Sequence, residues 1–263
     1  MINNKKLSKF YDKVYLKGEK KHYTKFVIEG TPTSEAEEVI KQLNWKNKKV
    51  LEVGCGTGRF CYLIAKKGAD VLGIDFSTKG IDIAKKTYQL SNLSFKTLDV
   101  AEIVGQYDVI VSIGTLEHMD NPLKTLRLLR THLKPDGKII ITSPNWANVR
   151  GYVLITLQCL FRAPITLADL HYLTPVDFIS WARKMNMNLK WKTFDRSWGH
   201  GELMLKDFER RIPRVLHDAK LPNYSENVNK LLKWLKQNVV SLDNSSEHSG
   251  AIGMYVFSIK KNP

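Results

Sequence analysis

The segment Glu52-Val53-Gly54-Cys55-Gly56-Thr57-Gly58 is the part of the sequence best suited to hold a ligand. Its glycines stand at every second position after a predicted strand, so the backbone can turn tightly and approach a ligand closely. A helix predicted to begin after Gly58 would direct its first N–H groups at the same ligand. Arg59 occupies the place of the third glycine in the dinucleotide pattern GxGxxG, which argues against a nicotinamide dinucleotide.

A carboxylate follows the next predicted strand along the chain. Asp75 comes at the end of the predicted strand within the segment Val71-Leu72-Gly73-Ile74-Asp75-Phe76. In nucleotide-binding folds a carboxylate at this place accepts hydrogen bonds from the ribose hydroxyls, and Phe76 could lie against an adenine ring. These two strand ends therefore predict a site for a ligand that contains adenosine.

The pattern Glu52-x-Gly54-x-Gly56-x-Gly58 resembles that of the class I methyltransferases, which use S-adenosylmethionine (SAM), and the resemblance covers residues 48–145. It implies that the loop wraps the methionine part of SAM and that Glu52 helps to hold its ammonium group. It also implies that Asp99 bonds the adenine amine and that the end of the fourth strand lies beside the transferred methyl group. The residues expected to bind SAM are Glu52, Gly54, Cys55, Gly56, Gly58, Asp75, Phe76, Asp99, Val100, Ser112 and Ile113.

The branch of the family that the sequence resembles contains quinone-biosynthesis and similar small-molecule O-methyltransferases. If the acceptor is a hydroxyl group, a base assists the removal of its proton, and histidine suits this task near neutral pH. His171 is the first candidate and His118 the second, whereas His200 is expected to have a structural role.

A metal ion is not expected. Some quinone O-methyltransferases bind a divalent metal through an acid three residues before a Glu-His pair, and here that position is Gly114. The pair Glu117-His118 alone is a poor ligand set for a hard divalent cation.

The elements that must position these residues alternate between strand and helix. Strands are predicted at 49–53, 69–74, 93–98, 107–113 and 138–142, with a turn at Lys134-Pro135-Asp136-Gly137. Ser77 and Asn121 are predicted to cap the helices that follow them. This alternation predicts an α/β fold with a largely parallel sheet. The resemblance implies a Rossmann-like, doubly wound sheet of seven strands with the last one antiparallel, and residues 187–194 and 253–260 would supply its final two strands.

The predicted organisation is a basic N-terminal arm at 1–30 and one SAM-dependent methyltransferase domain at 31–263, with insertions at 146–170 and 203–240. The 146–170 segment is apolar and is flanked by Arg150 and Arg162. It could line an acceptor pocket or contact a membrane surface, or it could be an ordinary lid helix or dimer face.

Composition narrows the choice of partner and location. The formal net charge is +15, from 41 Lys and Arg against 26 Asp and Glu, which suits an anionic partner. The sequence has three cysteines without a CxxC spacing, and it has neither an apolar signal segment nor an apolar run of about 20 residues. These features predict a cytoplasmic chain. The predicted function is methyl transfer from SAM to an apolar or anionic small molecule, with oxygen as the preferred acceptor atom. The alternatives are a tRNA or other RNA methyltransferase and a non-catalytic SAM-binding regulator, while the oligomeric state stays open.

Overall fold

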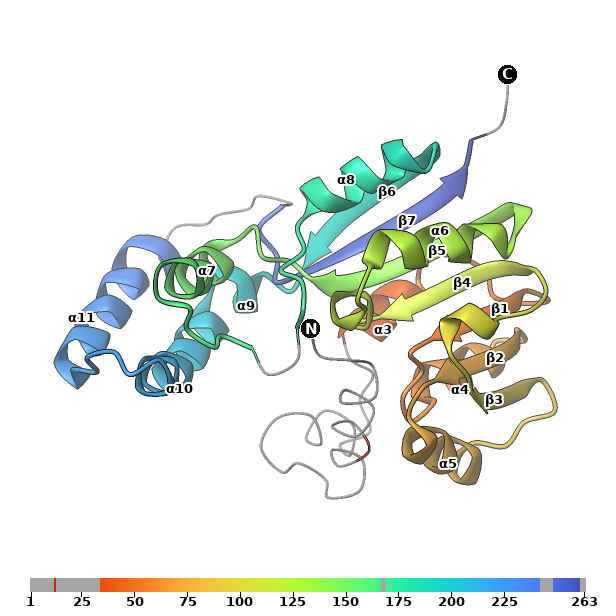
Figure 1. Ribbon diagram of the computed structural model, residues 1–263, viewed down its shortest axis with the longest axis horizontal. Coiled ribbons are helices and arrows are strands. Elements are labelled where there is room, and N and C mark those ends of the chain that lie inside the picture. Colours follow the sequence, from red (N-terminus) through yellow and green to blue (C-terminus); the bar gives the residue numbers. More distant parts are fainter. Residues whose placement is uncertain (1–11, 13–33, 167–168, 242–247, 261–263) are drawn as a thin grey trace. The chain divides into compact units, whose positions relative to one another are not determined.

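The computed structural model describes residues 12, 34–166, 169–241 and 248–260 (Figure 1). The chain forms two compact units. The first contains the residues up to Thr142, Ile179–Lys190 and the residues from Tyr255 onward. The second contains Ser143–Phe178 and Trp191–Met254. Apart from Asp12, the predicted arm at 1–30 lies outside the described residues.

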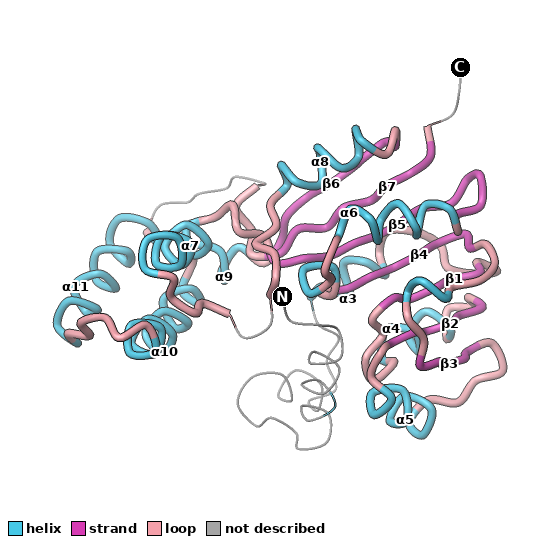
Figure 2. The backbone as a smooth tube through the Cα atoms, viewed as in Figure 1, coloured by secondary structure: helices cyan, strands magenta, loops and turns pink. Residues whose placement is uncertain are grey.

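Seven strands form one sheet in the order β3-β2-β1-β4-β5-β7-β6 (Figures 1 and 2). The registers of β1 with β2 and β4, of β2 with β3, and of β4 with β5 are parallel, and β7 runs antiparallel. The predicted fold class is therefore confirmed. The strands are β1 (Lys49–Val53), β2 (Asp70–Asp75), β3 (Leu93–Thr97), β4 (Tyr107–Ile113), β5 (Leu133–Pro144), β6 (Met187–Phe194) and β7 (Ile252–Ile259).

Two helices along the first part of the chain begin at the caps that the sequence predicts. Ser77 accepts a hydrogen bond from the Gly80 amide, and Asn121 accepts one from the Lys124 amide, so both predicted caps are confirmed. The helices of this part of the chain are α3 (Ser34–Ile40), α4 (Arg59–Ala65), α5 (Thr78–Thr87), α6 (Pro122–Thr131) and α8 (Pro175–Lys184), with short 3₁₀ turns η1 (Val100–Glu102) and η2 (Leu116–His118).

The turn predicted at residues 134–137 is wrong, because these residues belong to β5. Tyr107 of β4 pairs with Leu133, but Val109, two residues later, pairs with Lys138. The extra residues on β5 form a bulge, and bulges accommodate the proline and glycine that otherwise signal a turn.

Helices make up most of the described part of the second unit outside the strand ends. They are α7 (Val149–Phe161), α9 (Arg196–His200), α10 (Glu202–Asp218) and α11 (Ser225–Leu235), followed by the π-helical turn η3 (Lys236–Val240). Leu154, Phe208 and Val228 contribute one buried side chain each from α7, α10 and α11 to a shared apolar core. Burial of such stripes, rather than helix propensity, stabilises helices of this length.

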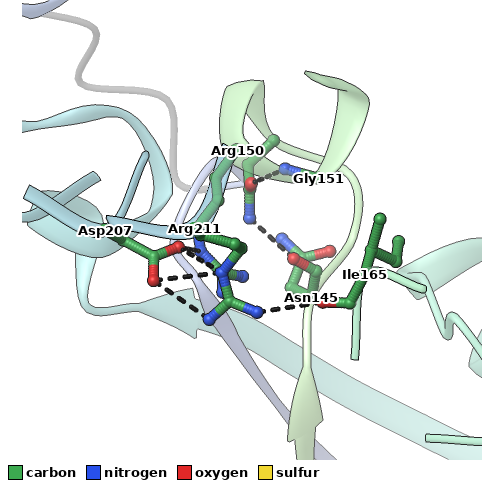
Figure 3. A network of polar contacts seen from close by, with 7 residues as sticks. Asn145, Arg150, Gly151, Ile165, Asp207 and Arg211 are labelled. Atoms are coloured by element: carbon green, nitrogen blue, oxygen red, sulfur yellow. Dashed lines mark hydrogen bonds and ion pairs between the residues drawn. The ribbon is translucent and has the colours of Figure 1, made fainter. Parts of the chain in front are cut away.

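A partly buried ion-pair network joins α7 to α10 within this unit (Figure 3). Arg150 Nε donates to Asp207 Oδ2 at 2.9 Å, and Arg211 donates to both oxygens of the same carboxylate. Arg211 also donates to the carbonyl oxygen of Ile165 at 2.9 Å. Burial by itself would raise the pKa of Asp207, but the two guanidinium groups outweigh it and hold that pKa below its usual value.

Within the described residues, none of the helices has both the length and the apolar character needed to cross a lipid bilayer.

Candidate active site

The glycine loop has the backbone geometry that its sequence predicts. Gly54, Gly56 and Gly58 have φ angles of +75°, +50° and +80°, a region that residues with a Cβ atom rarely adopt. The amides of Gly54 and Cys55 both donate to the Ile74 carbonyl oxygen, at 2.8 and 3.0 Å. The loop is therefore tied to the end of β2.

Two of the three glycines are required by the protein's own packing. A Cβ atom on Gly54 would lie 2.4 Å from the side chain of Thr115. A Cβ atom on Gly58 would lie 2.5 Å from the ring of Phe95 and 2.9 Å from Ala84. At these two positions the absence of a side chain thus lets the loop pack against Thr115, Phe95 and Ala84. Sequence spacing alone does not reveal these contacts.

Asp75 holds the middle of the loop. Its Oδ2 accepts the Gly56 amide at 2.9 Å and its Oδ1 accepts the Ser77 amide at 2.8 Å. A carboxylate has about four lone-pair sites, so this carboxylate can still accept a hydrogen bond from a ribose hydroxyl. Burial raises the pKa of Asp75, and hydrogen bonds from the backbone of Ser77, Gly56 and Phe76 oppose that rise. These features fit the adenosine part of SAM.

Asp12, from the segment predicted as an arm, lies next to this carboxylate. The Ser77 hydroxyl donates to Asp12 Oδ1 at 2.6 Å, and the negative charge of Asp12 contributes to the raised pKa of Asp75. Sequence reasoning did not identify Asp12 as a site residue, because no local spacing relates it to Ser77.

Glu52 is buried in the middle of the sheet, with β2 on one side of β1 and β4 on the other. The Cys61 thiol donates to its carboxylate at 2.7 Å. Burial raises the pKa of Glu52 to about 7, and the hydrogen bond from Cys61 opposes this rise. Glu52 can therefore change its charge near neutral pH. Cys61 is a second contact that sequence reasoning missed.

The other predicted SAM residues follow the neighbouring parallel strands. Ser112 and Ile113 end β4, and the buried Ser112 hydroxyl has no hydrogen-bond partner within the described residues. Asp99 caps η1 by accepting the Ala101 amide at 2.8 Å, with Val100 as the first residue of that turn. Phe76 directly follows β2.

Strands β1, β2 and β4 are neighbours and parallel, so the residues that follow their carboxyl ends lie at one edge of the sheet. The strand order reverses there, and ligands bind at such a switch point in doubly wound sheets. The structure brings together the glycine loop, Asp75 and the end of β4. The orphaned Ser112 hydroxyl at this edge is a polar group that a bound ligand could satisfy.

The three histidines have different surroundings. His118 is the buried last residue of η2, shortly after β4 in the first unit. His171 is partly buried and belongs to the second unit, in the segment between α7 and α8. His200 is buried at the end of α9, with Nδ1 3.3 Å from the Ser249 carbonyl oxygen. This contact gives His200 a structural partner.

In the part of the chain that the structure describes, no group of three or more histidine, cysteine or acidic side chains is arranged to hold a metal ion. A Cβ atom on Gly114 would lie 3.8 Å from Glu117 Oε1 and 4.0 Å from the Glu35 carboxylate. Glu35 of α3 therefore lies near the end of β4, although no spacing in the sequence connects the two.

A family model described as "Methyltransferase domain" matches residues 31–194. This chain belongs to the methyltransferase domain family. The match includes every residue predicted to bind SAM, together with His118 and His171, and it excludes His200, α10 and α11. The chain is a SAM-dependent methyltransferase, and SAM is its cofactor.

The curated relatives of this methyltransferase include two ubiquinone biosynthesis O-methyltransferases. That of Acinetobacter baylyi is 29% identical over 168 residues, which cover 57% of this chain and 70% of the relative. That of Actinobacillus pleuropneumoniae serotype 7 is 29% identical over 154 residues, covering 53% of this chain and 65% of the relative. The chain thus spans about two thirds of the length of these relatives.

Solved structures share the fold of this methyltransferase. The magnesium protoporphyrin IX methyltransferase of Synechocystis PCC 6803, with bound SAH, superposes with a TM-score of 0.57 at 18% identity, covering 71% of this chain and 91% of that one. A SAM-dependent methyltransferase of Thermotoga maritima, a possible histamine N-methyltransferase, superposes with a TM-score of 0.54 at 16% identity, covering 86% and 88%.

Proposed function

We propose that this methyltransferase transfers the methyl group of SAM to an oxygen atom of a small, apolar or anionic molecule. We choose oxygen and a small acceptor because the chain is similar to ubiquinone biosynthesis O-methyltransferases. The net charge of +15 supports an anionic acceptor.

The chain's own residues have distinct tasks in this proposal. Asp75 accepts hydrogen bonds from the ribose hydroxyls, and Glu52 in its ionised form attracts the ammonium group. Gly54, Cys55, Gly56 and Gly58 present backbone to the methionine part, while Phe76, Asp99 and Val100 lie along the adenine. Ser112 and Ile113 line the place of the reaction at the end of β4.

SAM, when bound, supplies a methyl group already activated by the positive charge of its sulfur. The protein then mainly has to align the acceptor oxygen with that methyl group, and alignment of this kind can contribute roughly 7–11 kcal/mol. The bond from oxygen to the methyl carbon forms as the bond from that carbon to sulfur breaks, and the acceptor proton passes to a base. His171 is the proposed base, with His118 as the second candidate.

The location and domain organisation complete the proposal. Cys55, Cys61 and Cys159 are free thiols, which supports a reducing compartment such as the cytoplasm. Residues 31–263 are proposed to form one methyltransferase domain, with the helices within 146–170 and 203–240 as its insertions.

A methyl-transfer screen tests the acceptor class. The full chain is incubated with tritiated SAM and with cell extract separated into metabolite, lipid, RNA and protein fractions. Label in the metabolite or lipid fraction supports the proposal, whereas label in the RNA or protein fraction alone refutes it.

RNA is the second candidate acceptor, because the net charge of +15 also suits a polyanion. Binding of RNA should weaken steeply with salt, since each phosphate contact releases counterions. A titration with bulk tRNA at several salt concentrations would show this slope if RNA is the substrate, and binding that is absent even at low salt would remove the alternative.

A further inference from the structure

A cavity of about 370 Å³ lies within the second unit, lined by residues of α7, α10, α11 and the segment before α11. Its volume falls within the range of roughly 300–1,000 Å³ that small-molecule sites occupy. Each helix contributes two aliphatic side chains to the wall. They are Val153 and Leu157 of α7, Ile212 and Leu216 of α10, and Val228 and Leu231 of α11.

The sequence spacing explains why these three helices line one cavity. The two wall residues of each helix are three or four positions apart, which places them on the same face. The three helices therefore present an aliphatic face to the same space.

Polar groups lie at the edge of this space. Tyr224 is 65% exposed, Asn227 is also exposed, and both line the cavity. The Thr156 hydroxyl, a third polar group of the lining, already donates to the Tyr152 carbonyl oxygen. Among the described residues, no lining side chain has a buried polar atom without a partner. The interior thus suits an apolar ligand, and the exposed edge suits a polar head group.

The volume of this cavity admits an aliphatic chain of medium length.

The charge of the surrounding segment indicates the sign of the head group. Residues 202–241 contain eight Lys and Arg against five Asp and Glu. We propose that the second unit binds an anionic amphiphile, whose aliphatic chain enters the cavity and whose head group stays at the edge near Tyr224 and Asn227. Because α10 and α11 lie outside the family match, this site goes beyond the proposed methyltransferase function and does not depend on it.

Isothermal titration of the full chain with sodium decanoate, below its micelle concentration, tests the site. One decanoate per chain is expected to bind and to raise the melting temperature, with a negative heat-capacity change from burial of the alkyl chain. Butyrate and decyltrimethylammonium serve as probes of chain length and charge, and each is expected to bind at least about tenfold more weakly, which corresponds to about 1.4 kcal/mol.

Val153→Phe places a larger side chain in the cavity and is expected to weaken decanoate binding by at least about tenfold. Leu160→Phe is the matched control, because Leu160 lies on the same helix, is 69% exposed and does not line the cavity. Asn227→Phe, at an exposed lining position, is a second variant in case Val153→Phe fails to fold.

Absence of decanoate binding to the wild type overturns the proposal. Equal affinities of wild type, Val153→Phe and Asn227→Phe for decanoate also overturn it, since the ligand would then bind elsewhere. Equal binding of decanoate and decyltrimethylammonium refutes the anionic head group. SAM titration of the same samples keeps the methyltransferase proposal separate, because the variants should bind SAM like the wild type.

Discussion

The amide nitrogen of Gly56 donates a 2.9 Å hydrogen bond to the carboxylate of Asp75. The central glycine of the loop after β1 is thereby held by the last residue of β2. The same carboxylate is proposed to bind the ribose of SAM, so one side chain would both shape the loop and bind the ligand.

Asp75→Asn is expected to weaken SAM binding by about 100-fold or more, because hydrogen bonds to a charged acceptor contribute about 1.5–3 kcal/mol each and two ribose hydroxyls are involved. Isothermal titration with SAM measures the change. Asp82→Asn, at an exposed position of α5, is the control and should bind like the wild type. Unchanged affinity in Asp75→Asn would remove Asp75 from the ribose site.

Glu52→Gln is expected to remove a pH dependence of SAM binding. Because the pKa of Glu52 is raised to about 7, its attraction for the SAM ammonium group should grow as the pH rises from about 6 to about 8. The wild-type dissociation constant should fall over this range, whereas that of the variant should be higher and nearly constant. Parallel pH profiles for the two proteins would contradict this role.

The same residue should affect stability with the opposite trend. The folded chain binds the Glu52 proton more tightly than the unfolded chain, so its contribution to the free energy of unfolding falls as the pH rises from about 4.5 to about 7. The stability of Glu52→Gln minus that of the wild type should therefore be greater at pH 8 than at pH 4.5. Melting temperatures of both proteins at the two pH values test this difference, and an equal shift would refute it.

Gly58→Ala is expected to lower the free energy of unfolding by about 2–5 kcal/mol, the sum of strain at positive φ and overpacking against Phe95. Gly105→Ala is the matched control. It has a similar φ of +85°, but its Cβ would meet only Lys49 Nζ, at 3.8 Å, so about 1–2 kcal/mol is expected. Urea unfolding measures both, and equal losses would show that packing against Phe95 is unimportant.

Asp207→Ala is expected to destabilise the second unit by about 3–5 kcal/mol, because it leaves the guanidinium groups of Arg150 and Arg211 without their shared carboxylate. Asp218→Ala is the control, since Asp218 pairs with Arg214 at 3.8 Å on the surface and should cost less than about 1 kcal/mol. Urea unfolding followed by circular dichroism compares the two variants. Similar losses in the free energy of unfolding would contradict the contribution to stability that is expected of the network.

Acid should weaken this network at low pH only. The pKa of Asp207 lies below its usual value of 3.8, so its contribution to stability is present above that value and is lost as the pH falls through the lower folded pKa. Unfolding of wild type at pH 2–5 should therefore show an acid-dependent loss that Asp207→Ala lacks. Identical acid profiles would refute this assignment.

Local patterns alone predicted much of the fold. The limits of β1, β4 and β6 agree with those expected, and Ser77 and Asn121 cap helices as predicted. Such signals succeed because a strand or a cap depends on residues within a few positions of each other. The same locality led to the prediction that the glycine loop and Asp75 form the core of a SAM site.

The bulge in β5 shows where local rules fail. Proline and glycine within residues 134–137 predict a turn, but the flanking residues Leu133 and Lys138 pair with β4 and the segment stays within β5. Interactions across the sheet thus outweigh the local preference of a short segment.

The sequence by itself determined the family, the order of the elements and the residues of the loop. Only the tertiary structure decided that Cys61 bonds Glu52, that Thr115 packs on Gly54, and that Asp207 joins Arg150 from 57 positions away. It also created the cavity between α7, α10 and α11. These contacts depend on which faces of the helices and strands meet when distant segments pack. The spacing of residues along one sequence does not show this directly.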